Sequence, residues 1–159
     1  MKKLFKKVTA LIAGATILAG AAFPAAASAE SAYMLRFNDV NERYEEAVSF
    51  LYELEIIKGK SPTEFGTYES LTRGDAAIIL ANALELDTEN APDAGFKDVN
   101  QREKGAVNAL VATGIVSGYT KDTYEPKKPL SRGAMAKFLV SGFDLSSYAV
   151  ETPFTDASG

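Results

Sequence analysis

The chain has 159 residues, of which 47% are hydrophobic and 24% charged, a composition that suits one compact globular domain behind a leader. It contains neither cysteine nor histidine, which excludes disulfides, metal sites built on thiolate or imidazole, and catalysis by either residue. Its net charge of −4 argues against nucleic-acid binding through a broad basic surface.

Residues 1–29 are predicted to be an export signal. Four lysines lie among the first seven residues, an uncharged run extends from 8 to 23, and Ala27-Ser28-Ala29 provides a small-residue cleavage site. The run is shorter than the roughly 20 residues of a transmembrane helix, so we expect a cleaved signal and no membrane anchor. Cleavage removes four lysines and no acid, which takes the net charge from −4 to −8.

The remaining sequence repeats itself at a spacing of 59 residues. Residues 37–87 align with 96–146 without a gap, and Phe154-Thr155-Asp156 opens a third copy. After a lead-in at 30–36, we predict one repeat at 37–95, a second at 96–153 and an incomplete third at 154–159. Such repeats bury their apolar faces against one another. We expect the chain to be part of a longer product, because it stops just inside a repeat.

Each repeat is predicted to begin with a helix. In the first copy, the apolar residues at helical spacing are Ala47, Val48, Leu51 and Leu54. Asp39-x-x-Glu42 resembles a capping box, although Asn41 is an alternative cap, and the second copy offers the same choice. We expect this helix to end near Gly59 in a left-handed conformation, and its partner at the matching glycine.

A loop with one aromatic residue, Phe65 or Tyr124, is predicted to precede a second helix in each repeat. Thr72 and Ser131 stand where a cap should be, directly before apolar runs of helical period. Polar segments with proline or glycine at 88–95 and 147–153 suit boundaries between units. The predicted fold is mainly α, a series of helix-loop-helix units.

The motifs in order are Phe-x-Asp-Val, Ile-(Ile/Val)-x-Gly, an aromatic loop and Leu-(Thr/Ser)-Arg-Gly. Over 37–159 they resemble the S-layer homology family. The resemblance implies a three-pronged helical spindle with grooves between units, in which the third unit is truncated here. It also implies secretion and anchoring to the cell wall of a Gram-positive bacterium. The implied partner is a secondary cell wall polysaccharide that carries pyruvate ketals, usually on N-acetylmannosamine.

The family's Thr-Arg-Ala-Glu stretch contributes its arginine to that ligand, which implicates Arg73 and Arg132 here. The first copy keeps the final acid as Asp75, whereas Ala134 replaces it in the second. A helix start offers unpaired N–H groups, an arginine matches a carboxylate, and the following glycine permits close approach. The predicted ligand-binding residues are Arg73, Arg132, Gly74, Gly133, Thr72, Ser131, Gly59, Gly118 and Lys60.

Several aromatic residues could stack on sugar rings. They are Tyr52, Phe65, Tyr68, Tyr119 and Tyr124, of which Phe65 and Tyr124 suit a core position better. Alternatively, Arg73 pairs with Asp75 or another nearby acid on a solvated face. Arg73-Gly74-Asp75 also spells an adhesion tripeptide, but a capped helix start is not the exposed flexible loop that such a ligand needs.

Acidic residues gather on the predicted first helix, including Glu42, Glu45 and Glu46. No apolar setting there would raise one pKa, so a solvated helix face explains them better than a hydrolase pair. No calcium-loop pattern is present, and we expect no enzyme activity, no metal and no cofactor. Two other functions stay open: a module that assembles surface-layer proteins, and the targeting part of a wall-lytic enzyme.

Overall fold

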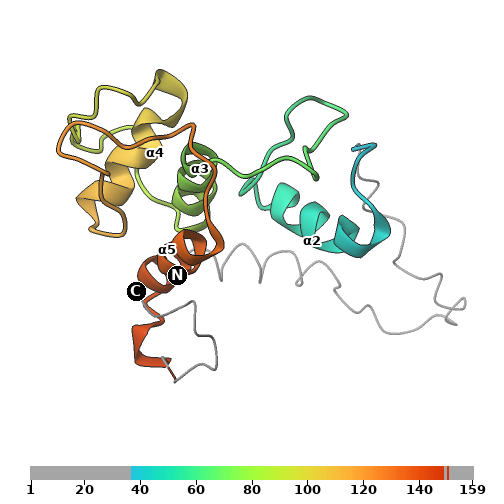
Figure 1. Cartoon of the computed structure of the whole chain (residues 1–159). Helices are drawn as coiled ribbons and strands as arrows, with labels where there is room; N and C mark the ends of the chain where they lie inside the picture. The colour runs from blue at the N-terminus through green and yellow to red at the C-terminus, as the bar shows by residue number, and fades with distance from the viewer. Residues whose placement is uncertain (1–36, 149, 151–159) are drawn as a thin grey trace, which may run out of the picture. The chain divides into compact units, whose positions relative to one another are not determined.

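The computed structural model describes residues 37–148 and 150. Within them, the helices are α2 (Glu42–Glu53), α3 (Arg73–Ala83), α4 (Gln101–Ala112) and α5 (Arg132–Gly142), followed by a 3-10 turn at Ser146–Tyr148 (Figure 1). These residues contain one isolated antiparallel bridge, between Thr72 and Pro129, and no strand. The predicted mainly α fold is confirmed. The predicted signal peptide, the lead-in and the start of the third repeat lie outside the described residues.

Asparagines cap the first helix of each repeat. The Asn41 side chain accepts the N–H of Arg43 at 3.1 Å, and Asn100 accepts the N–H of Arg102 at 2.9 Å. The asparagine alternative is therefore correct and the capping-box alternative at Asp39 is wrong. An Ncap side chain of this kind stabilises a helix by about 1 kcal/mol because it satisfies an amide that has no intrahelical acceptor.

Asp39 and Asp98 hold the aromatic loops instead. The Asp39 carboxylate accepts the N–H groups of Phe65 and Gly66, both at 2.7 Å, and Asp98 accepts the N–H of Tyr124 at 2.9 Å. The hydrogen bond from the Phe65 N–H is the largest of the contributions that lower the pKa of Asp39. The repeated Phe-x-Asp motif thus sets the loop conformation in both copies, because a carboxylate can accept several amides at once.

Two positions after its last residue, each of the four helices is followed by a residue in the left-handed region. Glu55, Glu85, Gly114 and Asp144 have φ values of 60°, 51°, 75° and 53°. The next amide folds back onto the last turn, as from Ile56 N–H to the Leu51 carbonyl at 3.0 Å, which is a Schellman motif with an apolar residue after the cap. The prediction that the first helices end at Gly59 and the matching glycine is wrong, because they end at Glu53 and Ala112.

Gly59 and Gly118 are required by aromatic rings. A Cβ atom on Gly59 would lie 2.2 Å from Cε1 of Phe37, and one on Gly118 would lie 2.4 Å from Cε1 of Phe96. Any side chain would displace the ring of the Phe-x-Asp motif. Both glycines therefore allow a phenylalanine to pack directly on the backbone.

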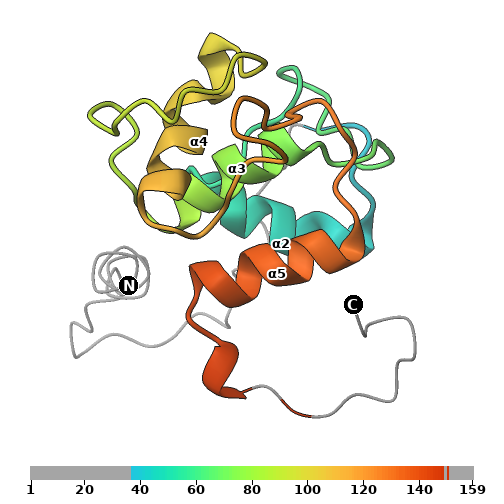
Figure 2. The same ribbon diagram turned by 60° about the vertical axis from the view of Figure 1, so that its left-hand side comes forward.

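The described chain falls into two compact units, 37–69 and 70–150. The boundary lies inside the first sequence repeat, between its two helices. In the second unit α3 packs against α4, with which it lies side by side in Figures 1 and 2. The second helix of one repeat and the first helix of the next thus share a core, whose fully buried members include Ala77, Val107, Leu110 and Tyr124. No described helix is long and apolar enough to cross a membrane.

Candidate functional site

The first turn of α3 is capped and its amides are occupied. Thr72 Oγ1 accepts the N–H of Asp75 at 3.1 Å, and the N–H groups of Arg73 and Gly74 donate to the carbonyls of Lys128 (2.9 Å) and Pro126 (2.8 Å). Thr72 is the predicted cap. The expectation of unpaired amides is wrong at this helix, because the loop of the second repeat satisfies them.

The Arg73 side chain reaches into the same loop. Its Nε donates to the Tyr124 carbonyl at 3.0 Å and its Nη2 to the Ser117 carbonyl at 2.7 Å. Its guanidinium lies over the rings of Tyr124 (4.5 Å to the centroid), Phe138 (5.1 Å) and Tyr119 (5.3 Å). Within the described residues its Nη1 makes no hydrogen bond. The group is therefore held in one orientation with one donor edge remaining for a ligand.

Among the described residues Arg73 forms no ion pair with Asp75 or another acid, and its hydrogen-bond partners are carbonyls, so that alternative is wrong. Asp75 accepts Nη2 of Arg102 at 2.7 Å, and Nη1 of Arg102 lies 3.4 Å from Oε1 of Glu103. Glu103 is buried against the first turn of α3, where a Cβ on Gly74 would lie 3.0 Å from its Cγ. An acid at this end of α3 suits the positive end of the helix dipole.

Gly74 brings two repeats together. A Cβ atom at this position would also lie 3.1 Å from the carbonyl oxygen of Pro126, which accepts the Gly74 amide. The close approach predicted for a ligand is made here by the protein's own loop. A ligand role for Gly74 stays a prediction.

An exposed tyrosine at the edge of this junction has two cations close to its ring. Tyr119 is 55% exposed, its ring centroid is 5.3 Å from the Arg73 guanidinium, and Lys128 Nζ lies 4.2 Å from the same centroid. Hydrogen bonds to Glu125 and then to Tyr119 raise the pKa of Lys128, which keeps the amine charged. We call Arg73, Tyr119 and Lys128 the tyrosine rim. Lys128 was missed from the sequence because Glu69 stands at its place in the first copy.

Tyr124 belongs to the core, as predicted. It is fully buried against Phe96, with ring centroids 5.7 Å apart, and its hydroxyl has no hydrogen-bond partner among the described residues. Burial raises its pKa to about 12, although the Arg73 charge acts in the opposite direction. Its part in the junction is therefore to contact Arg73, through its ring and through the hydrogen bond that its carbonyl accepts.

The second Arg-Gly start, on α5, has a different environment. Ser131 caps the helix as predicted, with its Oγ accepting the N–H of Ala134 at 3.1 Å. Arg132 is exposed, and among the described residues neither its side chain nor the N–H groups of Arg132 and Gly133 have a partner. A Cβ on Gly133 would meet nothing within 4 Å. Two nearly identical motifs are thus closed in one copy and open in the other.

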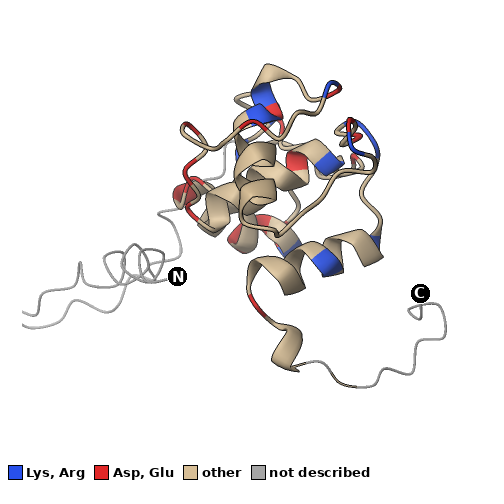
Figure 3. Cartoon of the chain, turned by 90° about the vertical axis from the view of Figure 1, so that its left-hand side faces the viewer, with Lys and Arg blue, Asp and Glu red and all other residues tan. Residues whose placement is uncertain are grey.

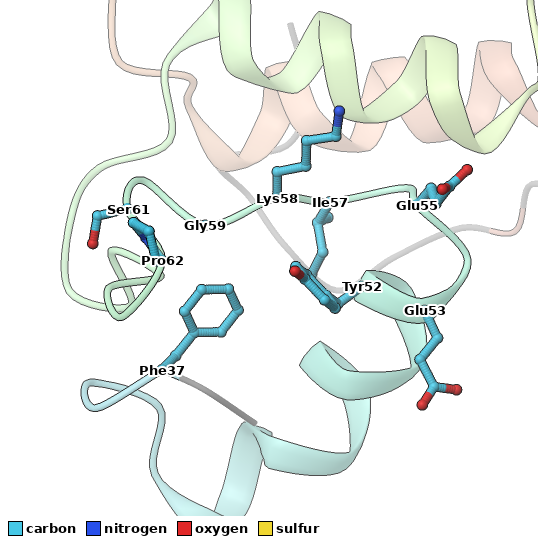
Figure 4. A pocket seen from close by; sticks show the side chains of 9 residues that line it. All are labelled: Phe37, Tyr52, Glu53, Glu55, Ile57, Lys58, Gly59, Ser61 and Pro62. Atoms are coloured by element: carbon cyan, nitrogen blue, oxygen red, sulfur yellow. The ribbon is translucent and has the colours of Figure 1, made fainter. Parts of the chain in front are cut away.

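The remaining predicted ligand-binding residues are distant in sequence from the starts of α3 and α5. Lys60 forms an ion pair with Glu69. Gly59 lines a pocket of about 570 Å³ in the 37–69 unit. The rings of Phe37 and Tyr52 meet there edge to face, with centroids 5.6 Å apart. Figure 4 shows both rings at the pocket, while the carboxylates of Glu53 and Glu55 and the amine of Lys58 point away from it. The lining is mostly apolar at its centre, so this pocket does not suit an anion by itself.

Along the described part of the chain, basic and acidic residues occur close to one another. Figure 3 shows basic and acidic residues interspersed along the ribbon. In the part of the chain that the structure describes, no group of three or more acidic, histidine or cysteine side chains could hold a metal ion. Recognition of an anion on this surface would depend on local cations rather than on the overall field.

Comparison with known proteins identifies the same family along most of the chain. The profile of the S-layer homology domain family matches residues 36–77 and 95–136, which together make up more than half of the chain. The chain is 34% identical over 155 residues to the "Surface-layer 125 kDa protein" of Lysinibacillus sphaericus, covering 96% of this chain and 13% of that protein. Identity to the "S-layer protein EA1" of Bacillus anthracis is 31% over 144 residues, or 89% of this chain and 16% of that protein.

An enzyme is among the relatives as well. The "Endoglucanase" of Bacillus sp. (strain KSM-635) is 30% identical over 103 residues, which is 65% of this chain and 11% of the enzyme. The chain therefore spans less than a fifth of the length of these relatives.

Proposed function

The chain belongs to the S-layer homology domain family, and on that premise we propose that it is a non-catalytic module that anchors an exported protein to the wall of a Gram-positive bacterium. Surface-layer proteins and an endoglucanase share this segment with it, which supports surface attachment rather than a particular chemistry. We propose that its ligand is an anionic secondary cell wall polysaccharide with pyruvate ketals, each of which carries one carboxylate.

The tyrosine rim is the observation that carries this proposal. A pyruvylated sugar presents a ring and a localised negative charge, and the rim presents an exposed tyrosine with two cations close to its ring. Tyr119 would stack on the sugar, while Arg73 Nη1 and Lys128 Nζ would bind the carboxylate. Charge-assisted hydrogen bonds of this kind are shorter and stronger than those between neutral groups.

Arg73 is suited to this role because it is already ordered. Two carbonyls and three rings hold its guanidinium, so little side-chain entropy remains to be lost when a ligand binds. Lys128 pairs with Glu125 at 2.7 Å and would have to share its charge with the ligand. Arg73 should therefore provide most of the affinity.

A role in wall binding is compatible with the two other functions, which are the assembly of surface-layer proteins and the targeting of a wall-lytic enzyme. Exposed apolar side chains on α5, Leu139 and Val140, favour protein assembly as a second property of the same module. The endoglucanase relative supports the idea that such a module can target an enzyme, whose catalytic part would lie elsewhere in the product.

Co-sedimentation with purified cell walls tests the proposal. The chain should pellet with untreated walls and stay in the supernatant when the ketal groups have been removed chemically. Equal pelleting before and after removal would refute carboxylate recognition. Lys121→Ala serves as a matched control, because Lys121 is an exposed cation of the same loop that lies outside the rim.

A further inference from the structure

The loop that carries part of the tyrosine rim is anchored by one carboxylate. Asp98 accepts the N–H of Tyr124 at 2.9 Å and the N–H of Glu125 at 2.8 Å. Asp98 precedes α4, whereas the two amides belong to the loop after that helix, 26 and 27 residues further along the chain. One side chain therefore fixes the middle of this loop to the start of the same repeat.

Glu125 adopts a backbone conformation that its side chain does not favour. Its φ is 60°, in the left-handed region, whereas the first repeat has a glycine at the matching position, Gly66, with a φ of 91°. A residue other than glycine stays in this region only where its surroundings hold it there. The hydrogen bond from the Glu125 N–H to Asp98 is such a restraint, so the conformation of the loop depends on Asp98.

Tyr124 connects this restraint to Arg73. The N–H of Tyr124 donates to Asp98, and its carbonyl accepts Nε of Arg73 at 3.0 Å. The centroid of its ring lies 4.5 Å from the same guanidinium. A displacement of Tyr124 would therefore turn the guanidinium, whose Nη1 is the donor proposed to bind the ligand.

The other two members of the rim are bonded to the residues on either side. The N–H of Tyr119 donates to the carbonyl of Thr123 at 2.8 Å. The N–H of Lys128 donates to the carbonyl of Glu125 at 3.1 Å. Three consecutive carbonyls, those of residues 123–125, thus bind the three members of the rim, and the anchoring carboxylate holds the same segment.

The anchor acts as a charged acceptor. Burial raises the pKa of Asp98, but the hydrogen bonds from the Tyr124 and Glu125 amides outweigh it and hold that pKa below its usual value. The carboxylate is therefore ionised at neutral pH and can accept both amides. Asparagine has nearly the same shape but only one acceptor oxygen, because its NH₂ group is a donor. Asp98→Asn should consequently keep one of the two bonds and lose the other.

We propose that Asp98 is a positioning residue for wall binding, which keeps residues 123–125 in the conformation that orients the tyrosine rim toward the polysaccharide. It acts through the three carbonyls of that segment and not by contact with the ligand. This inference rests on the proposed function, because it names what holds the same site in place. Removal of a negative charge would by itself favour an anionic ligand, so a loss of affinity on substitution would not be an electrostatic effect.

Co-sedimentation of the whole chain with untreated cell walls at increasing wall concentration tests the inference. Asp98→Asn should weaken binding about fivefold or more. Asp39→Asn is the matched control, because Asp39 anchors the loop of the first repeat in the same way. That loop has Lys60 and Glu69 where the rim has its tyrosine and lysine, so Asp39→Asn should bind walls as the wild type does. The pair separates an effect on the rim from the loss of a loop anchor as such.

A double-mutant cycle separates positioning from a general loss of structure. Lysine at position 73 has no Nε–H for the Tyr124 carbonyl to orient, so in the Arg73→Lys background Asp98→Asn should weaken binding by about twofold or less. In the unliganded chain, the NMR signal of the Arg73 Nε–H should shift in Asp98→Asn and stay unchanged in Asp39→Asn. If Asp98→Asn loses its helical CD signal, Asp98→Glu gives the same comparisons, because it keeps the charge but displaces the carboxylate by one methylene group.

Three results would overturn the inference and leave ketal recognition intact. They are undiminished wall binding by a folded Asp98 variant, equal losses from Asp98→Asn and Asp39→Asn, and fully additive effects of Asp98→Asn and Arg73→Lys. Wild-type binding that does not depend on the ketal groups would instead refute the proposed function, and the inference with it.

Discussion

Arg73 donates its Nε–H to the carbonyl oxygen of Tyr124 at 3.0 Å and places its guanidinium 4.5 Å from the centroid of the ring of that residue. The two residues are 51 positions apart and belong to different repeats. An arginine in the first turn of a helix faces the positive end of the dipole, which is unfavourable by a few tenths to about 1 kcal/mol. The carbonyls and rings of the next repeat offset this cost.

Arg73→Ala should lower the free energy of unfolding by about 2 kcal/mol, because two loop carbonyls lose their donor and the aromatic rings lose their cation. Urea titration followed by CD at 222 nm measures the change. Arg132→Ala is the matched control and should change the stability of the monomer by less than about 0.5 kcal/mol. Equal effects of the two substitutions would contradict the closed and open environments described above.

Gly74→Ala and Gly133→Ala should have opposite effects. At Gly74 the new methyl group would meet the Glu103 side chain and the Pro126 carbonyl, so we expect a loss of about 1–3 kcal/mol. At Gly133 the space is open, and reduced freedom of the unfolded chain should stabilise the protein by about 0.4–1 kcal/mol. Thermal unfolding of both variants in parallel measures the difference, and a similar shift of Tm in both would argue against the junction.

Tyr124→Phe should reduce the decrease in the free energy of unfolding that occurs at alkaline pH. The buried hydroxyl of Tyr124 has its pKa raised to about 12 from 10.0, so the folded state resists ionisation that the unfolded state undergoes. Stability that is present below pH 10 is therefore lost as the pH rises from about 10 to 12. Within 37–148 the hydroxyl has no hydrogen-bond partner, so its removal should cost little stability at neutral pH. Tm measured as a function of pH tests this prediction, and Tyr68→Phe serves as the exposed control. If the Tm of both variants fell with pH as steeply as that of the wild type, the prediction would be wrong.

Arg73→Lys and Tyr119→Ala should each weaken binding to untreated cell walls by roughly tenfold or more, while Lys121→Ala should bind as the wild type does. Lysine keeps the charge but lacks the planar fork with which arginine reaches two carbonyls and a carboxylate in different directions. Tyr119 is exposed, so its loss should not unfold the protein. Co-sedimentation at increasing wall concentration gives the affinities. Undiminished binding by both variants would remove the tyrosine rim as the ligand site.

Helix positions and caps could be predicted closely because they depend on residues near in sequence. Thr72 and Ser131 cap their helices with amides three residues away, and the apolar period locates the helices themselves. The error at Gly59 has a simple origin. A glycine after a helix suggests a left-handed stop, but here its missing side chain serves the Phe37 ring, which is distant in sequence and close in space.

The sequence by itself determined the repeat, its helices and the family to which the chain belongs, because these follow from spacing and local hydrogen bonding. It could not tell Arg73 from Arg132, since both follow a hydroxyl cap and precede glycine. Only the tertiary structure decided that the first is enclosed and the second is open. The physical reason is that the acceptors of Arg73 are carbonyls 44 and 51 residues further along the chain, and a donor is satisfied only where folding brings such acceptors within reach.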